Sequence, residues 1–253
     1  MKALLTLLWL ACAGSHAAST LTLGLGNQAS PPYKLGDDTL PATRPGVAVA
    51  LLQQAAAQCD VQLHITLLPG ARMLKALENG ELDAAGLLSY SPERAAYAAY
   101  PMHQSRPDEN KRLATLSYVL YARRGHQLQW DGSTLQGLKR KVGTNTGWSI
   151  NRDLEKLGIA AEPANSVTQN FMKLQAGRID AYATHQALGD RYMAQHGNLP
   201  LVRLRPAIVS KPYYLIFSRR FASRHPTLAN CMWQQIASQR DRFYHQHLPD
   251  YLD

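Results

Sequence analysis

Long apolar runs are missing from most of this 253-residue sequence. One apolar run, residues 4–13, is shorter than the ~20 residues that a helix needs to cross a bilayer, which argues against a membrane anchor. Lys2 precedes this run, and Ser15-His16-Ala17 follows it with residues that a signal peptidase reads. We therefore expect residues 1–18 to be a signal peptide, cleaved after Ala17 or Ala18, and the mature protein to be periplasmic.

Cysteine is scarce, and of the three cysteines Cys12 falls within the expected signal peptide. It raises a lipoprotein alternative, which the bulky Trp9 and Leu10 before it disfavour. An oxidising compartment permits a bridge between Cys59 and Cys231, but the sequence does not show whether their Cα atoms come close enough. We interpret them as two free buried thiols and keep the disulfide open as the alternative.

Patterns that hold metals or cofactors are also absent. The histidines are scattered, and no Cys-x-x-Cys pair occurs. Gly24-x-Gly26 lacks the third glycine and the following helix of a dinucleotide-binding loop. No residue stands out as a catalytic nucleophile. We expect neither a metal nor a cofactor.

Acidic residues are fewer than basic ones, with 18 Asp and Glu against 27 Lys and Arg, so the net charge is +9. No basic stripe is interleaved with aromatic residues, which argues against a nucleic-acid partner. Outside the cell, such an excess favours solubility or an anionic small ligand.

An internal repeat is the most informative pattern that is present. Leu77-Glu78-Asn79-Gly80-Glu81-Leu82-Asp83-Ala84 is echoed by Leu174-Gln175-Ala176-Gly177-Arg178-Ile179-Asp180-Ala181. In each copy an amphipathic helix ends on a glycine that can adopt the left-handed conformation, and a short apolar strand follows. The alternation of strands and helices around both copies predicts parallel βαβ units, and hence two similar α/β lobes with a cleft between them.

Several motifs, taken in order, resemble a known family. They are Pro31-Pro32-Tyr33, Leu77-x-x-Gly80-x-Leu82-Asp83-Ala84, Ser91-Pro92-Glu93-Arg94, Val142-Gly143-Thr144-Asn145-Thr146-Gly147, Gly177-Arg178-Ile179-Asp180-Ala181 and Tyr213-Tyr214-Leu215-Ile216-Phe217-Ser218. The chain resembles the bacterial extracellular solute-binding proteins of family 3, which include the amino-acid receptors of ABC transporters. The resemblance covers nearly the whole mature chain.

This resemblance implies a two-lobed type II periplasmic binding fold of the α/β class. Each lobe would be a mixed, mostly parallel sheet flanked by helices, with the ligand cleft between the lobes. We expect one lobe to consist of residues 19–108 and 212–253, and the other of residues 115–208. The segments 109–114 and 209–211 would form the hinge.

The resemblance also assigns ligand-binding roles in the first lobe. Arg94 ends the family's Ser/Thr-x-x-Arg pattern and is expected to grip a ligand carboxylate through two parallel hydrogen bonds. Ser89 precedes it at a strand end, in a loop that is about one residue longer than the family pattern. Tyr33 takes the place of an aromatic residue that stacks on the ligand, although a loop tyrosine resting on its own lobe is the alternative. Arg72 is expected either to reach the cleft or to be a solvated helix start.

In the second lobe, Thr146-Gly147-Trp148 is a glycine turn that leads into a helix. Such a turn directs backbone N–H groups and the positive end of the helix dipole at an anion, whereas the alternative is a plain tight turn. Trp148 is interpreted equally well as core or as cleft wall.

His185 is the position at which the chain departs from the family. The family's amino-acid receptors place an Asp five residues after the repeat's Asp, where it takes the ligand's ammonium group, and here that position is His185. We interpret Asp83 and Asp180 as structural acids that hold backbone N–H groups. His185 could accept one hydrogen bond when neutral, or add positive charge below about pH 6.5. We therefore expect a ligand that lacks an α-amino group, or another anion.

The expected function is that of a monomeric, non-enzymatic binding protein. It would capture a small polar, carboxylate-bearing solute, an amino acid or a related acid, and deliver it to an inner-membrane ABC permease. One alternative is an enzyme that resembles cyclohexadienyl dehydratases, which requires a general acid in the cleft. A third interpretation is a periplasmic sensor module that acts through a separate partner.

Overall fold

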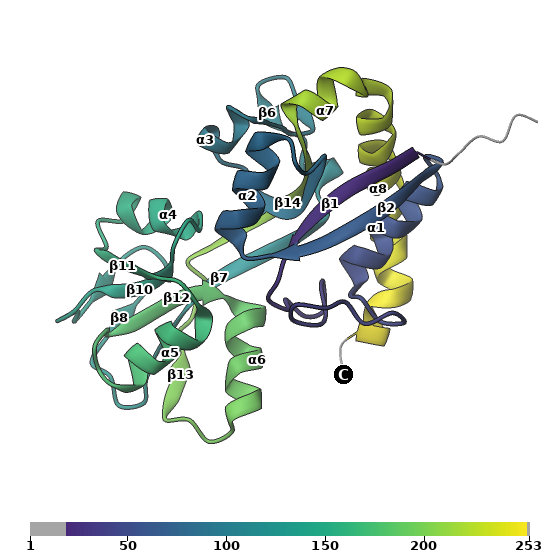
Figure 1. Cartoon of the computed structure of the whole chain (residues 1–253). Helices are drawn as coiled ribbons and strands as arrows, with labels where there is room; N and C mark the ends of the chain where they lie inside the picture. The colour runs from purple at the N-terminus through teal and green to yellow at the C-terminus, as the bar shows by residue number, and fades with distance from the viewer. Residues whose placement is uncertain (1–18, 252–253) are drawn as a thin grey trace, which may run out of the picture.

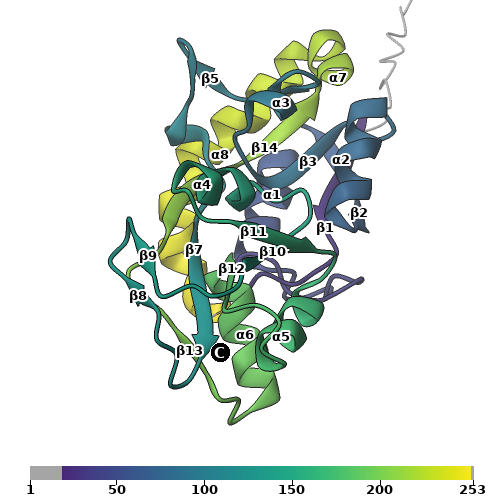
Figure 2. The ribbon, with the colours of Figure 1, turned by 90° about the vertical axis from the view of Figure 1, so that its left-hand side faces the viewer.

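The computed structural model describes residues 19–251. The expected signal peptide, with Cys12, lies outside the described residues. Within residues 19–251, no helix combines the length and the hydropathy that a membrane span requires. The described chain forms two α/β lobes that share one continuous sheet (Figures 1 and 2).

Lobe 1 is built from both ends of the described chain. Its strands β1, β2 and β3 run parallel to one another. They are β1 (Ser19–Gly26), β2 (Val61–Leu68), β3 (Ala84–Ser89) and the short β4 (Ala98–Ala99). Its helices are α1 (Val47–Ala57), α2 (Gly70–Asn79), α3 (Pro92–Ala95), α7 (Arg219–Arg224) and α8 (Pro226–His247).

Lobe 2 repeats the arrangement with the middle of the chain. Strand β10 pairs in parallel with both β11 and β12. The strands are β10 (Val142–Asn145), β11 (Ala161–Ala164), β12 (Ala181–His185) and β13 (Leu201–Arg203). The helices are α4 (Ile150–Lys156), α5 (Val167–Gln175) and α6 (Gln186–His196).

Two long strands cross between the lobes. Strand β7 (Ala114–Arg123) pairs antiparallel with β12 in lobe 2, and β14 (Val209–Ser218) pairs antiparallel with β3 in lobe 1. Near the crossing they pair with each other, from Val209 opposite Tyr118 to Tyr213 opposite Ala114. The sheet order is therefore β11-β10-β12-β7-β14-β3-β1-β2. The expected hinge segment 209–211 lies at the start of β14, while the lobe boundaries stay a prediction.

Short elements without a strong sequence pattern complete the fold. They are the hairpin of β5 (Met102–His103) and β6 (Arg106–Pro107), the hairpin of β8 (Gln129–Trp130) and β9 (Leu135–Gln136), and the 3-10 turns η1 (Glu109–Lys111) and η2 (Leu248–Tyr251). The two hairpins leave no pattern in the sequence, because two-residue strands are too short to show a period of two.

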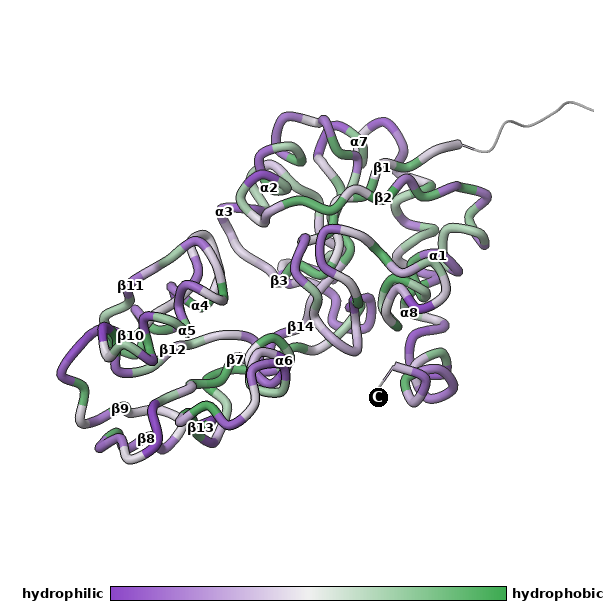
Figure 3. Tube along the Cα trace, turned by 60° about the horizontal axis from the view of Figure 1, so that its bottom comes forward, coloured by the Kyte–Doolittle hydropathy of each residue, from purple (hydrophilic) through white to green (hydrophobic). Residues whose placement is uncertain are grey.

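Each lobe has its own hydrophobic core. In lobe 1, the apolar faces of α1 and α8 cover the central strands, and Leu23, Leu52 and Phe217 are fully buried there. In lobe 2, two clusters lie on the two faces of the sheet, around Leu120 and Phe171. Figure 3 shows that hydrophobic segments concentrate inside each lobe, and that the outer loops are mostly hydrophilic.

The repeated sequence forms the same scaffold in both lobes. Gly80 and Gly177 have φ angles of +74° and +67°, which confirms the left-handed glycines expected after α2 and α5. Asp83 accepts hydrogen bonds from the amide and hydroxyl groups of Thr22, at 2.9 and 2.7 Å. Asp180 accepts hydrogen bonds from two successive amides just before β10, those of residues 139 and 140. Both acids are thus structural, as expected.

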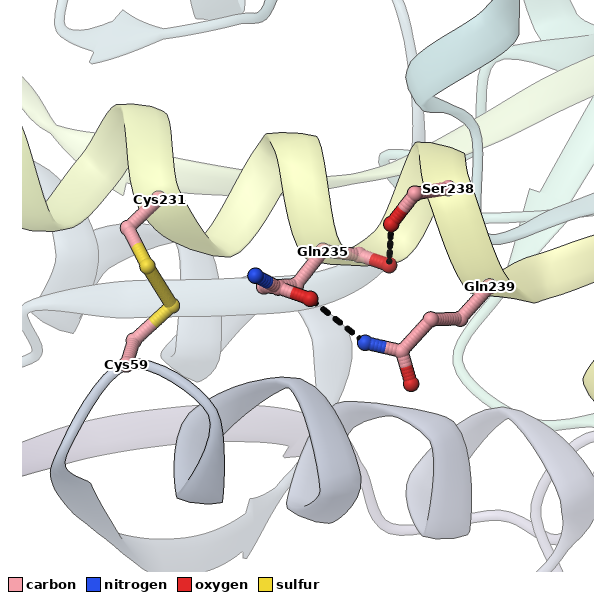
Figure 4. The surroundings of a disulfide bond; sticks show 5 residues. All are labelled: Cys59, Cys231, Gln235, Ser238 and Gln239. Carbon is pink, nitrogen blue, oxygen red and sulfur yellow. Dashed lines mark hydrogen bonds between the residues drawn. A yellow bond between two sulfur atoms is a disulfide. The ribbon is translucent and has the colours of Figure 1, made fainter.

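Cys59 and Cys231 form a disulfide, which corrects the interpretation of two free thiols (Figure 4). Their Cα atoms lie 6.0 Å apart although 172 residues separate them in sequence. Helix α8 returns from the far end of the chain and packs on α1, and the Gln54 amide donates a hydrogen bond to Gln239 across this helix pair. The packing of the two helices brings the cysteines together, and no local pattern in the sequence encodes that packing.

Candidate functional site

A cavity of about 380 Å³ lies between the lobes. It lies at the carboxyl ends of β1, β3, β10 and β12, where open α/β sheets bind ligands, and its volume is in the range of small-molecule sites. Six of the eight residues expected from the sequence line it: Ser89, Arg94, Thr146, Gly147, Trp148 and His185.

Arg94 is a buried cation at this cavity, with 7% of its surface exposed. Ser91 caps the short helix α3 by accepting a hydrogen bond from the Arg94 amide, which fixes the backbone that carries the guanidinium. Nη1 donates to the Ser89 carbonyl oxygen and to the Tyr100 hydroxyl. Nε has no hydrogen-bond partner. Within the described part of the chain, no Asp or Glu forms an ion pair with this side chain.

The strand before Arg94 contains a bulge that shapes the cavity wall. The register of β3 against β14 shifts between Tyr214 and Ile216, so two residues of β3 oppose one of β14. Leu87 lies in this bulge with a φ angle of +56°, a conformation that is costly for a large non-glycine residue. The bulge accounts for the extra residue before Ser91 and places Leu87 and Ser89 on the cavity lining.

His185 ends β12 and lies in a cluster of aromatic rings. Its ring stacks on Trp148 at 4.9 Å and contacts the Tyr118 ring at 4.2 Å between centroids. Its Nε2 shares a hydrogen bond of 2.6 Å with the Tyr213 hydroxyl. Burial, assisted by the nearby Lys211 charge, lowers the pKa of His185 to about 3.

This pKa corrects one part of the sequence interpretation. His185 stays neutral in the free protein far below pH 6.5, so it does not supply positive charge near that pH. Burial also raises the pKa of Tyr213 well above 10, so its hydroxyl is protonated. The pair therefore offers neutral hydrogen-bonding groups to a ligand and no ionic partner for an ammonium group.

The Thr146-Gly147-Trp148 turn lines the cavity, but its amides are largely used within lobe 2. The Thr146 amide donates to the Ala164 carbonyl at 3.0 Å, and the Trp148 amide donates to the Asn145 carbonyl at 3.2 Å. The expectation that this turn presents its successive N–H groups to an anion is thus wrong for these two amides, because the turn closes on β10 and β11. Trp148 forms the cavity wall and also packs against both hydrophobic clusters of lobe 2.

Tyr33 and Arg72 do not line the cavity. The Tyr33 ring packs at 6.2 Å from the Tyr244 ring of α8, and its hydroxyl donates to the Thr115 carbonyl. The ring therefore rests on its own lobe, which was the alternative interpretation, while the hydroxyl reaches the start of β7, where the chain crosses to lobe 2. Arg72 is exposed to solvent on the first turn of α2, which was the alternative interpretation for this residue.

Lys34, which no sequence motif singles out, lines the cavity instead of Tyr33. Only 2% of its surface is exposed. A lysine in a polar loop normally indicates solvent exposure, so no sequence signal identified it. Tyr118, Tyr213 and Ser149 were also missed, because residues near a strand crossing look like ordinary core or turn residues.

The charges of the cavity lining are of one sign. Among its lining residues in the described chain, Lys34 and Arg94 are cationic and none is an Asp or Glu. Lys211 lies just behind the lining, where it forms an ion pair with Asp153 and donates a hydrogen bond to Ser149. The cavity is therefore electropositive. Its remaining lining side chains are either apolar or uncharged groups that can form hydrogen bonds.

Two ion pairs connect the lobes beside the cavity. Asp37 of the loop after β1 accepts hydrogen bonds from both Nη atoms of Arg191 in α6, at 2.7 and 3.2 Å. Glu93 of α3 pairs with Arg152 of α4. These contacts hold the lobes close to each other.

Neither a protein-family model nor a curated protein matches the sequence. Solved structures do match. An ancestral arginine-binding protein bound to glutamine has a TM-score of 0.69 and 17% identity, over 94% of this chain and 99% of that one. A histidine kinase sensor domain with similarity to periplasmic binding proteins has a TM-score of 0.71 and 18% identity, over 92% and 96%.

The substrate-binding protein of an amino acid ABC transporter is also similar, with a TM-score of 0.67 and 14% identity, over 92% of this chain and 98% of that one. At these low identities the structural similarity establishes the fold alone, and it covers 96% or more of each similar structure. The expected fold class is thereby confirmed: the chain has the two-lobed type II periplasmic binding fold of the family 3 solute-binding proteins.

Proposed function

We propose that this chain is a periplasmic solute-binding protein that captures a small carboxylate-bearing solute by closure of its lobes, for uptake through an ABC permease. The observation that carries the proposal is Arg94, which is buried at the interlobe cavity with an unbonded Nε and no carboxylate partner among the described residues. Burying an unpaired charge is costly, and a ligand carboxylate would compensate it with charge-assisted hydrogen bonds.

The same site argues against an α-ammonium group on the solute. An ammonium group taken out of water needs an anionic partner. No Asp or Glu is among the described residues that line the cavity, and the residue at the expected acid position is the neutral His185. We therefore propose an organic acid without an amino group.

The way in which the lobes are joined supports lobe closure. We propose that residues 19–108 and 212–253 move as one body and residues 115–208 as the other, with 109–114 and 209–211 as the hinge. In residues 19–251, β7 and β14 are the strands that cross between the lobes, and domain closure of this kind is absorbed by a few residues at element ends. The permease partner rests on the similarity to the substrate-binding protein of an ABC transporter.

Sensing is a second candidate function, which the similarity to a histidine kinase sensor domain favours. Ligand capture would be the same, and the closed form would contact a separate sensor partner. Loss of solute uptake after deletion of the gene supports transport, whereas unchanged uptake with lost transcriptional response supports sensing. A dehydratase is less supported, because the described cavity lining offers no carboxyl group for the general-acid step.

Calorimetric titration of the purified protein tests the proposal. Organic acids without an amino group should bind, and common L-amino acids should not. Arg94→Gln should lower the affinity for such an acid by about 10- to 100-fold, since a hydrogen bond to a charged group contributes about 1.5–3 kcal/mol. Arg106→Gln, which removes an exposed arginine of the β5–β6 hairpin, is the matched control and should bind normally. Tight binding of common L-amino acids, or full affinity in Arg94→Gln, would contradict the proposal.

A further inference from the structure

Lys34 is a second buried cation among the residues that line the cavity. The backbone of its loop is closed by hydrogen bonds between Ser30 and Lys34, at 2.8 Å and 3.0 Å. Gly46 packs directly beneath, where a Cβ atom would come within 2.4 Å of the Lys34 Cα. The loop is therefore fixed on both sides, and the side chain is 2% exposed.

The ammonium group of Lys34 is incompletely satisfied. Nζ donates to the Gly36 carbonyl oxygen, and an ammonium group has three donors. In the described chain no Asp or Glu forms an ion pair with it. The nearby Asp37 is already bound by Arg191 and by the Ala29 amide.

The charge state of Lys34 follows from its surroundings. Burial lowers the pKa of Lys34 to about 8, and Asp37 opposes that shift. The side chain therefore remains mostly protonated at neutral pH, and the cavity contains two buried cations without an acid among its described lining residues.

Arg94 and Lys34 line the cavity from different elements, the short helix α3 after β3 and the loop after β1. Arg94 donates hydrogen bonds to Ser89 and Tyr100, whereas Lys34 donates to Gly36. The two sets of partners do not overlap, and the remainder of the lining includes the apolar side chains Leu87, Leu116 and Leu188. One anionic group on the solute can neutralise one of these cations and would leave the other buried and unpaired.

On the basis of the proposed function, we propose that the solute is a dianion, with one anionic group on Arg94, the second on Lys34, and an apolar body between them. The class that fits is a small dicarboxylic acid without an amino group. A cavity of about 380 Å³ accommodates a molecule of this size.

Matched pairs of acids test the inference by calorimetry at neutral pH. Each pair is a dicarboxylic acid and its monoamide, which has nearly the same shape and one charge fewer: glutarate with glutaramate, adipate with adipamate, and phthalate with phthalamate. The wild-type protein should bind at least one dicarboxylate about tenfold or more tighter than its monoamide, as expected for one further charge-assisted hydrogen bond.

Variants of Lys34 assign the preference to this residue. Lys34→Gln should lower the affinity for the dicarboxylate by about tenfold or more and remove its advantage over the monoamide. Lys34→Arg should keep most of the preference because it keeps the charge. Lys75→Gln, which removes an exposed lysine of α2, is the matched control and should behave like the wild type. If circular dichroism shows that Lys34→Gln is unfolded, the same comparison is made with Lys34→Met.

The outcomes separate this inference from the proposed function. Equal affinities for dicarboxylates and monoamides, or an unchanged preference in the Lys34 variants, would overturn the dianion and leave acid capture at Arg94 in place. Failure of every acid in the panel to bind would overturn both.

Discussion

At the scale of single residues, His185 shows how neighbours set the chemistry of a side chain. Histidine titrates near neutral pH in water, yet packing between the rings of Trp148 and Tyr118 removes the solvation that its charged form needs. The ring is therefore a neutral hydrogen-bonding surface at the end of β12. The identity of the residue alone leaves both charge states open.

This environment predicts a pH dependence of stability. The pKa of His185 is lowered from 6.5 in the unfolded chain to about 3 in the folded protein. Between these values the unfolded state binds the extra proton, so the stabilisation is complete above about pH 6.5 and is lost as the pH falls toward 3. The slope contributed by one such group is at most about 1.4 kcal/mol per pH unit.

Urea unfolding between about pH 7 and pH 5 measures this slope. His185→Gln should flatten the decline in the free energy of unfolding, because glutamine does not titrate. His103→Gln, which changes an exposed histidine of β5, is the control and should leave the slope of the wild type unchanged. An equal decline in His185→Gln and the wild type would show that His185 is not held neutral.

At the scale of elements, lobe 1 depends on helices from opposite ends of the chain. Helix α8 packs against α1, and residues of both helices share one hydrophobic core. The Cys59–Cys231 disulfide fixes this pair and closes a loop that contains all of lobe 2. A cross-link over so long a loop restricts the unfolded chain strongly.

Removal of this cross-link should destabilise the protein without changing the site. The double variant Cys59→Ser/Cys231→Ser should lower the free energy of unfolding by about 2–4 kcal/mol, as measured by urea unfolding under oxidising conditions. Ligand affinity should persist at temperatures where the variant is folded, because neither cysteine lines the cavity. Two titratable thiols in the native wild-type protein would contradict the disulfide.

At the scale of the whole molecule, ion pairs across the cavity favour the closed arrangement. Asp37–Arg191 joins the loop after β1 to α6, and Glu93–Arg152 joins α3 to α4. Each pair has one member in each lobe, so opening the lobes breaks it. Ligand affinity then has two sources: the contacts of the ligand itself, and the interlobe ion pairs that favour the closed form.

This arrangement predicts a modest effect of Arg191→Gln on binding. A solvent-accessible ion pair contributes about 0.2–1 kcal/mol, so affinity for the solute should fall by up to about fivefold, and less at high salt where the pair is screened. Arg178→Gln, an exposed arginine of the same lobe, is the control. Small-angle scattering should show a more open ligand-free form in Arg191→Gln only. Unchanged affinity and shape would mean that this pair does not stabilise closure.

The sequence predicted the scaffold well because the scaffold depends on local patterns. Gly80 and Gly177 adopt the left-handed conformation that ends helices α2 and α5, and Asp83 and Asp180 each follow three residues later. The candidate site was less predictable. The sequence placed Tyr33 at the cavity, whereas the fold places its neighbour Lys34 there, since adjacent loop residues can face opposite directions.

The sequence by itself thus determined two α/β lobes and the repeated scaffold. It also determined that an arginine stands at position 94 and that a histidine, in place of an acid, stands at position 185. These follow from periodicity, turn residues and motif spacing, which act over a few residues. Only the tertiary structure decided that Lys34 is buried, that His185 is neutral, and that Cys59 meets Cys231. Burial, desolvation and cross-linking depend on contacts that form only when the chain folds, such as the packing of α8 on α1.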